Sequence, residues 1–284
     1  MQEMLGTPKE EEKGLVNLAV DPDMLARELE AEQQGDPLDD ICPNDTRESK
    51  LEAIRECDAA LSWLQQDQQQ RLQGLRVFCE HRDSRAVPLL LPLLEAPCPI
   101  IRMSAVYALG RNPSTKAVKP LIRLLRVDSN AFVRKATAWS LGNYSDAPVI
   151  HPLIHALQTD VASVRLWATA SLVEAGMTSA VKADLAASQL LLALRLDAEP
   201  TVRSNCIWAL GQLHNLLVTS RQEELVNAVV IAFLHDREST VRDEAYSTLE
   251  QLGDPDLLKC LQLSADRGFS DWRGTVSKVR NNFP

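Results

Sequence analysis

The sequence predicts an all-α solenoid built from about six helical hairpins. Leu and Ala dominate a chain that is 45% hydrophobic and only 5% aromatic, and strand-like alternation of β-branched residues is nearly absent. In addition, one segment pattern returns five times at intervals of 31 to 39 residues. Repeats of this length stack as helical hairpins, because a single hairpin cannot bury its apolar face alone.

The repeated segment consists of an apolar residue, an Arg, several small residues and a Leu seven positions after the Arg. Its five copies are IIRMSAVYALG (100–110), FVRKATAWSLG (132–142), SVRLWATASLV (163–173), TVRSNCIWALG (201–211) and TVRDEAYSTLE (240–250). Their apolar residues recur at helical spacing, so each copy is predicted to be the second helix of a hairpin.

Another apolar run precedes each copy and is predicted to be the first helix of the same hairpin. These runs cover residues 86–97, 117–128, 149–160, 188–197 and 224–236, with Pro88, Pro120 and Pro152 near the helix starts, where proline costs least. A degenerate sixth hairpin is predicted over 49–67 and 69–81. The two longest intervals predict insertions near 176–187 and 214–222.

An aspartate follows most first helices, and an Arg opens each second helix. The aspartates are Asp128, Asp160, Asp197 and Asp236, and the arginines are Arg102, Arg134, Arg165, Arg203 and Arg242. We expect each Arg to hydrogen-bond the turn aspartate of its own or a neighbouring hairpin and so to stabilise the stack. The alternative is a row of cations that binds an anion.

The sequence predicts three regions, an acidic tail, the solenoid and a C-terminal segment. Residues 1–48 hold fourteen Asp or Glu and four Lys or Arg, although the net charge of the whole chain is −9. We expect 1–48 to be a flexible acidic tail, in which 21–30 or 36–41 could alternatively serve as a docking peptide. The solenoid is predicted over 49–265, and 266–284, with Phe269 and Trp272, is expected to cap its last repeat.

Composition also indicates which kinds of partner and which cellular location to expect. With a pI near 5.1 and no basic stripe evident in the sequence, nucleic acid is not an expected partner. The chain has no apolar stretch of membrane-spanning length and no apolar leader, so a cytoplasmic protein without membrane insertion is expected. Its six cysteines lie far apart, which favours reduced thiols.

The second helices are predicted to line a concave groove, to which residues one, five and nine positions after each Arg point. Large aromatic residues occupy several of the central positions, where polar side chains are usual. Aromatic anchors with a polar rim suit recognition of a helix or of a flat conjugated ligand. The candidate groove residues are Tyr107, Arg111, Lys135, Trp139, Asn143, Trp208 and Gln212, together with Trp167 on the neighbouring register. The alternative is that the aromatic rings only extend the core between adjacent second helices.

Catalytic and metal-binding signals are weak. His151 and His155 share one helix face, but no third ligand is evident nearby, so we expect surface residues and no metal site. Cys79 and Cys98 are the best candidates for ligands of an iron-sulfur cluster, whereas Cys206 is expected to be an inert core residue. Motifs for phosphate, dinucleotide or acyl chemistry are absent from the sequence, so a self-contained enzyme is not expected.

The repeats IIRMSAVYALGRNPSTKAVKPLIRLL, FVRKATAWSLGNYSDAPVIHPLIHAL and TVRSNCIWALGQL resemble the HEAT-like repeats of the cyanobacterial phycobilin lyases of the E/F type and their relatives. Within that group, RMSAVYALGRNPS, VRKATAWSLGN and VRLWATASL most resemble the branch that interacts with the iron-sulfur carrier IscA. The resemblance implies a HEAT-repeat α-solenoid that acts as a non-catalytic scaffold or chaperone.

The resemblance also implies two classes of partner. The first is an iron-sulfur carrier of the IscA type, in which case any cluster is held through the partner and the chain has no intrinsic cofactor. The alternative is a phycobiliprotein, with the chain acting as a bilin lyase or isomerase, or as a phycobilisome assembly or degradation factor. In that case the aromatic strip would hold a bilin.

Overall fold

The structure is a computed structural model and describes residues 47–253. The chain divides into two compact units, Met1–Ile54 and Arg55–Pro284. Helix α2 (Arg47–Trp63) begins in the first unit and ends in the second. Across residues 47–253 the secondary structure is helical throughout and forms six hairpins, which confirms the predicted α-solenoid.

Each hairpin pairs a first helix with a second helix. After α2, the first helices are α4 (Val87–Leu90) with η2 (Leu91–Glu95), α6 (Thr115–Val127), α8 (Ile150–Thr159), α10 (Ala180–Leu196) and α12 (Thr219–His235). The second helices are α3 (Gln68–Glu80), α5 (Pro99–Arg111), α7 (Ala131–Gly142), α9 (Ala162–Gly176), α11 (Pro200–Leu213) and α13 (Ser239–Gln251). The short 3₁₀ turns η1 (Ser84–Ala86) and η3 (His214–Leu216) complete the connections.

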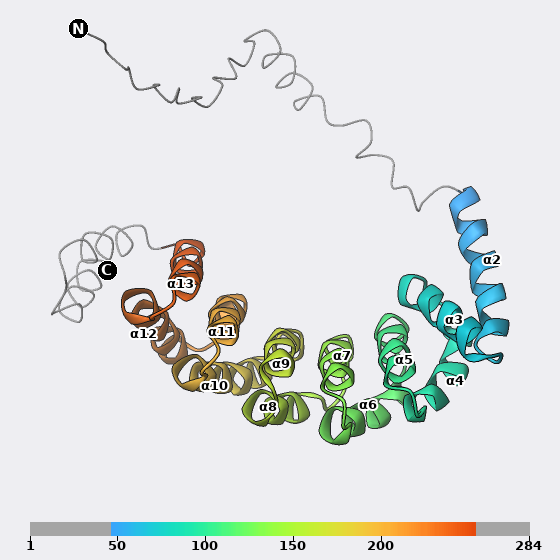
Figure 1. The fold of residues 1–284 in the computed structure, drawn as a ribbon. Helices are drawn as coiled ribbons and strands as arrows, with labels where there is room; N and C mark the ends of the chain where they lie inside the picture. The colour runs from blue at the N-terminus through green and yellow to red at the C-terminus, as the bar shows by residue number, and fades with distance from the viewer. Residues whose placement is uncertain (1–46, 254–284) are drawn as a thin grey trace, which may run out of the picture. The chain divides into compact units, whose positions relative to one another are not determined.

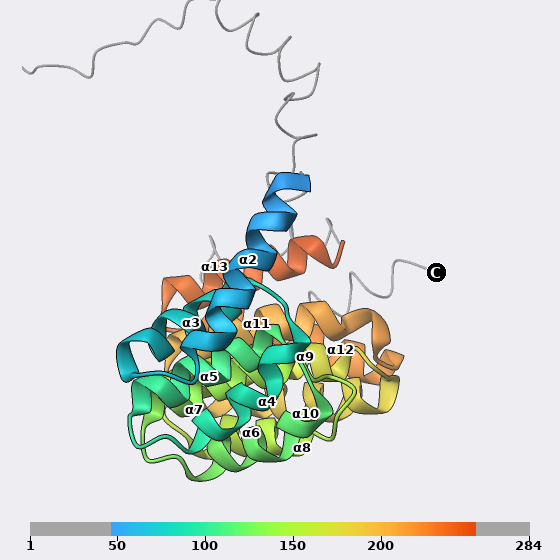
Figure 2. The same cartoon turned by 90° about the vertical axis from the view of Figure 1, so that its right-hand side faces the viewer.

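Within the second unit the helices form two rows. Figure 1 shows α5, α7, α9, α11 and α13 side by side on the inner side of an arc, with α6, α8, α10 and α12 on the outer side. Figure 2 views the same array end-on, so that the hairpins follow one behind another. Small and branched apolar side chains fill the space between the rows, for example Leu109, Leu141 and Leu172 from the inner row and Leu121, Leu153 and Leu190 from the outer row.

Local sequence explains where the second helices begin. Pro99 and Pro200 occupy the first position of α5 and α11, where the helix has no use for a backbone N–H. Asn130 caps α7, because its side-chain oxygen accepts hydrogen bonds from the N–H groups of Phe132 and Val133. The predicted turn aspartates directly follow the outer helices, so that prediction is confirmed.

The predicted first helix over 86–97 is wrong in one respect, because it is broken into α4 and the 3₁₀ segment η2. Pro88 and Pro92 cause the break. Pro92 has no N–H to donate to the carbonyl of Pro88, and its ring collides with that carbonyl in an α-helix. The tighter 3₁₀ geometry avoids this conflict.

Four other predicted first helices, observed as α2, α6, α10 and α12, begin earlier than expected. Helix α6 begins at Thr115 after the cap Ser114, so Pro120 lies inside the helix and not near its start. The predicted insertions near 176–187 and 214–222 do not form long loops. They lengthen α10 and α12 to 17 residues each and add η3. Extra residues that can continue an amphipathic helix bury more surface there than they would in a loop.

The predictions for the C-terminal cap and for all but the last two residues of the acidic tail concern residues outside 47–253. Among the helices of that range, none is long and apolar enough to cross a membrane.

Candidate partner-binding surface on the second helices

The second helices are held in place by a repeated ion pair at the turn edge of the array. Each Arg donates two hydrogen bonds to the aspartate of the next turn, with donor–acceptor distances between 2.6 and 2.9 Å. The four pairs are Arg102–Asp128, Arg134–Asp160, Arg165–Asp197 and Arg203–Asp236. We call them the Arg–Asp ladder.

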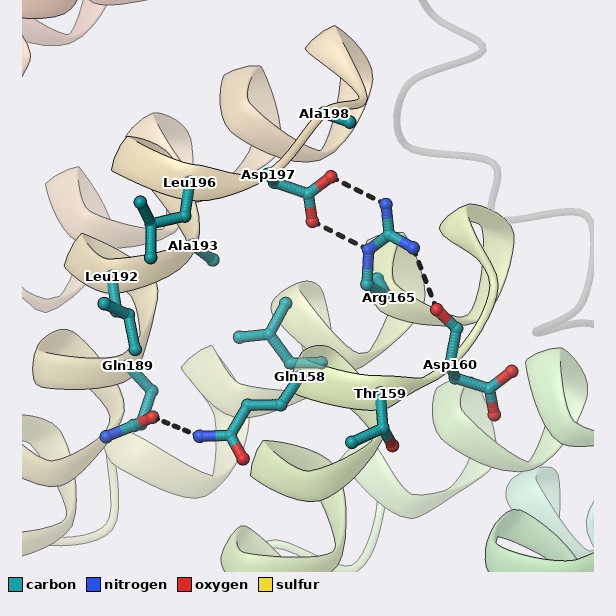
Figure 3. Close-up of a pocket in the computed structure, with 11 residues that line it drawn as sticks. Gln158, Thr159, Asp160, Arg165, Gln189, Leu192, Ala193, Leu196, Asp197 and Ala198 are labelled. Carbon is teal, nitrogen blue, oxygen red and sulfur yellow. Dashed lines mark hydrogen bonds and ion pairs between the residues drawn. The ribbon is translucent and has the colours of Figure 1, made fainter.

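The same guanidinium also ties each Arg to its own hairpin. Arg165, for example, donates to the backbone oxygen of Asp160 at 2.8 Å while it pairs with the carboxylate of Asp197, as Figure 3 shows. Arg242 donates to the backbone oxygen of Asp236 at 2.8 Å, and no carboxylate within residues 47–253 completes its pair. The ladder therefore joins consecutive hairpins, as predicted, and its cations are occupied by the protein itself.

The carboxylates of the ladder respond to these bonds. Hydrogen bonds from Arg203 hold the pKa of Asp236 below its ordinary value, and burial opposes them only in part. Burial acts to raise the pKa of Asp128, but bonds from Arg102 and from the backbone N–H of Asn130 outweigh it, so the pKa is again lowered. Both groups are thereby held in the charged form that the arginines need.

The predicted groove positions lie on the inner row and away from the core. All fifteen residues located one, five or nine positions after an Arg are exposed or partly exposed, whereas the Leu seven positions after the Arg is buried in each copy. The central row, read from α5 to α13, is Tyr107, Trp139, Ala170, Trp208 and Ser247. We call these five residues the inner strip.

Two of the strip's aromatic residues contact each other across neighbouring helices. The ring centroids of Tyr107 and Trp139 are 5.2 Å apart, with ring planes at 53°. A Cβ atom on Gly110 would lie 2.6 Å from Cζ3 of Trp139, so the indole rests against the backbone of α5. Both rings are half-buried, and burial raises the pKa of Tyr107. This pair thus packs between second helices and also faces outward.

Trp208 is in a different situation. Its side chain is exposed (37%), and within residues 47–253 it forms no ring contact of the kind that joins Tyr107 and Trp139. Ala170 occupies the neighbouring strip position on α9. Trp167, predicted on the adjacent register, is half-buried and packs against the core. The strip therefore contains one packed aromatic pair and one tryptophan that is partly exposed and has no aromatic partner within residues 47–253.

Charge changes sign along the rows of residues that flank the inner strip. Arg111 is exposed, with Nε 3.3 Å from the backbone oxygen of Cys79, and Lys135 is half-buried on α7. Asn143 and Gln212 are exposed. On the same rows further along the chain, Glu174 and Asp243 are exposed as well. The surface is cationic beside Tyr107 and Trp139 and anionic on α9 and α13.

The candidate ligand residues are placed apart from one another. Cys206 is fully buried, which raises its pKa to about 12. Burial likewise raises the pKa of Cys79 to about 11, and its Sγ lies 3.7 Å from the backbone oxygen of Ser104. Cys98 is half-buried at the start of α5, and His151 and His155 are exposed on α8. Within residues 47–253, no three His, Cys, Asp or Glu side chains are grouped to hold a metal ion.

A cleft of about 520 Å³ opens between α8 and α10 on the outer row (Figure 3). Its side chains Leu192 and Leu196 are exposed, and Gln158 donates a hydrogen bond of 2.6 Å to Gln189 across it. Arg165 and Asp197 at one end neutralise each other. The cleft is therefore lined by apolar and uncharged polar side chains, and its charged residues are held in ladder pairs.

No basic stripe was expected from the sequence, but the structure shows one on α6. Helix α6 carries Lys116, Lys119, Arg123 and Arg126, all exposed, at spacings of three and four residues that place them on one face. The net charge of −9 concealed this local cationic surface.

These observations define the class of protein as an α-solenoid. The Arg–Asp ladder recurs at the turn edge of consecutive hairpins, whereas the residues of the inner strip differ from one hairpin to the next. The family profile for HEAT repeats matches residues 58–142, 87–173 and 187–275. The chain therefore belongs to the HEAT-repeat family. No curated protein matches the chain in sequence.

Solved structures support the same fold. A designed armadillo repeat protein in complex with the peptide (KR)4 superposes with a TM-score of 0.54 at 19% identity, covering 70% of this chain and all of its own (100%). An engineered protein superposes with a TM-score of 0.50 at 19% identity, covering 68% of this chain and 98% of its own. At this level of identity the likeness concerns the fold.

Proposed function

We propose that this chain is a non-catalytic scaffold that holds a partner protein along the inner strip. Tyr107, Trp139 and Trp208 act as anchors, and Arg111, Lys135, Asn143 and Gln212 form the polar rim. The observation that carries the proposal is the exposed indole of Trp208 on a helix whose other large apolar residues are buried. Tryptophan ranks among the residues that contribute most binding energy at protein interfaces.

The designed armadillo protein in complex with (KR)4 is a solenoid of similar fold that binds a peptide, which supports a binding role for a chain of this fold. The inner strip differs from a uniform peptide track, since its side chains change from one hairpin to the next. A surface whose side chains differ in each hairpin suits a folded partner of matching shape better than a peptide of repetitive sequence.

The partner we propose is an iron-sulfur carrier of the IscA type, in line with the resemblance of the repeats. The cluster then remains with the carrier. Cys79 is a poor ligand in this conformation, because ligation needs a thiolate and burial raises its pKa to about 11.

The second candidate is a phycobiliprotein or its bilin, and one observation favours it. The tilted pair of Tyr107 and Trp139 presents two half-exposed rings side by side, and a flat conjugated tetrapyrrole could stack on them. This candidate predicts a coloured complex when the protein is mixed with free bilin.

The test is affinity capture of the full chain from native lysate under anaerobic conditions, reading both the bound proteins and the absorption spectrum. We expect an IscA-type protein with broad cluster absorption. Phycobiliprotein subunits with a sharp bilin band would favour the second candidate. The Trp139→Ala/Trp208→Ala double variant should lose the partner. Phe132→Ala, which removes an exposed ring outside the strip, should retain it. If the double variant captures as much partner as Phe132→Ala does, the inner strip is not the binding surface.

A further inference from the structure

The outer face of α6 is a cationic ridge, which we define as Lys116, Lys119, Arg123 and Arg126. All four side chains are exposed, whereas Ala117, Val118, Leu121 and Leu125 on the opposite face are buried. The helix therefore uses one face for the core and presents four positive charges on the other. No acidic residue occurs within α6.

The ridge is scarcely neutralised by the residues around it. Its one ion pair within residues 47–253 joins Arg123 to Glu95 at 3.2 Å, and both side chains are largely exposed (74% and 78%). Such a pair contributes little and can be displaced. The ridge also lies in the positive half of the second unit, since residues 55–135 contain 13 Lys or Arg and 7 Asp or Glu, and residues 136–253 contain 7 and 13.

A cleft of about 730 Å³ runs beside the ridge, between η2 and α6. Leu94, Leu124 and Val127 supply its apolar side chains, and Val127 is 68% exposed. Lys119 and Arg123 stand at its edge. Three further charged residues line the cleft: Glu95, which pairs with Arg123, and the ladder residues Arg102 and Asp128, which neutralise each other. The cleft thus has apolar side chains in its interior, and the cations Lys119 and Arg123 stand at its edge.

We propose that the cationic ridge and this cleft bind an acidic, leucine-bearing peptide segment of a partner protein. Carboxylates of the peptide would pair with Lys119 and Arg123 and displace Glu95, while a leucine side chain would cover Val127 and Leu124. The apolar cleft distinguishes this ligand from a polyanion that offers charge alone. The site lies on the outer row, so it is independent of the inner strip.

The test uses the full chain and a fluorescent twelve-residue peptide built from Glu and Leu, with binding followed by anisotropy at low ionic strength. Two further peptides replace Glu by Lys or Leu by Ser. We expect binding of the Glu/Leu peptide alone, weakening as salt is added because exposed charges are screened. The Lys119→Glu/Arg123→Glu variant should bind about tenfold more weakly, and Glu95→Gln about twofold more tightly.

Arg195→Glu is the matched control, because Arg195 is also exposed on an outer helix and pairs with a glutamate, Glu224. It should bind the peptide as the wild type does. Equal weakening by Arg195→Glu, or equal binding of the Glu/Ser peptide, would overturn the proposal in favour of nonspecific charge attraction. Binding to phosphatidylglycerol vesicles without binding of the peptide would assign the ridge to a membrane surface. A salt-sensitive dimer abolished by the ridge variant, again without peptide binding, would assign it to a second copy of the chain.

Discussion

The Arg–Asp ladder and the inner strip lie on the same second helices, yet they behave in opposite ways. The ladder repeats with the same residues and with donor–acceptor distances that vary by only 0.3 Å over four hairpins. The strip places Tyr, Trp, Ala, Trp and Ser at one equivalent position. Repetition marks the groups that hold neighbouring hairpins together, and variation marks the surface available for recognition.

Removing one ladder arginine is the strongest test of whether the ladder stabilises the fold. Arg134→Ala leaves Asp160 without its ion pair and also frees the backbone oxygen of Asp128. Because Asp160 is largely buried, we expect a loss of about 3 kcal/mol in the free energy of unfolding, measured in urea. Arg123→Ala, which removes an exposed pair, should cost less than about 0.5 kcal/mol. Equal costs would refute a stabilising role for the ladder.

Trp139 tests whether the strip itself contributes to stability. Replacing it by Ala removes its contacts with Tyr107 and with the backbone at Gly110. We expect a loss of about 2 kcal/mol, below the cost for a fully buried Trp because this ring is half-buried. Thermal unfolding followed by circular dichroism measures it. A neutral effect would mean that the ring packs no more tightly than a surface residue.

Gly110 tests the close approach of α5 and α7 directly. Gly110→Ala would place a Cβ 2.6 Å from Trp139, so the ring must move, and we expect a loss of about 1 kcal/mol. In a Trp139→Ala background most of that loss should vanish, giving a coupling of similar size in a double-mutant cycle. If the two substitutions have additive effects on stability, the added Cβ does not act through Trp139, and its contact with Ser140 becomes the more plausible cause of the loss.

The ladder also predicts how stability depends on pH. The pKa of Asp236 is lowered in the folded protein, so its pairing contributes stability above the unfolded-state pKa and loses it as the pH falls through the folded-state pKa. We expect the free energy of unfolding to decline below about pH 4. In Arg203→Ala this part of the decline should be smaller. Urea titrations between neutral and acidic pH would show an unchanged slope if the pair does not matter.

Much of the fold follows from the sequence, because the Asp, Arg and Leu of each repeat report local helix ends and a periodic core. The break at Pro92 and the early start of α6 at Thr115 were missed, since the apolar pattern alone does not locate caps or proline conflicts. Both the break and the early start are local effects that could have been predicted from Pro92 and from the cap residue Ser114.

The candidate surface was harder to derive. The rotation of each second helix could be inferred from the Arg, which placed Trp208 on the surface. The contact of Tyr107 with Trp139 depends on how closely two repeats approach, and Gly110 was its only sequence signal. The cationic ridge was missed because net charge averages over the acidic N-terminal residues and hides a local face.

The central claim is that the strip recognises a partner while the ladder maintains the fold, and Trp208→Ala tests it most directly. The measurement is the affinity of the captured partner by titration calorimetry, with urea unfolding of the same variant. We predict binding about tenfold weaker or more, with the free energy of unfolding within about 0.5 kcal/mol of wild type. Unchanged affinity in the folded variant would contradict the account.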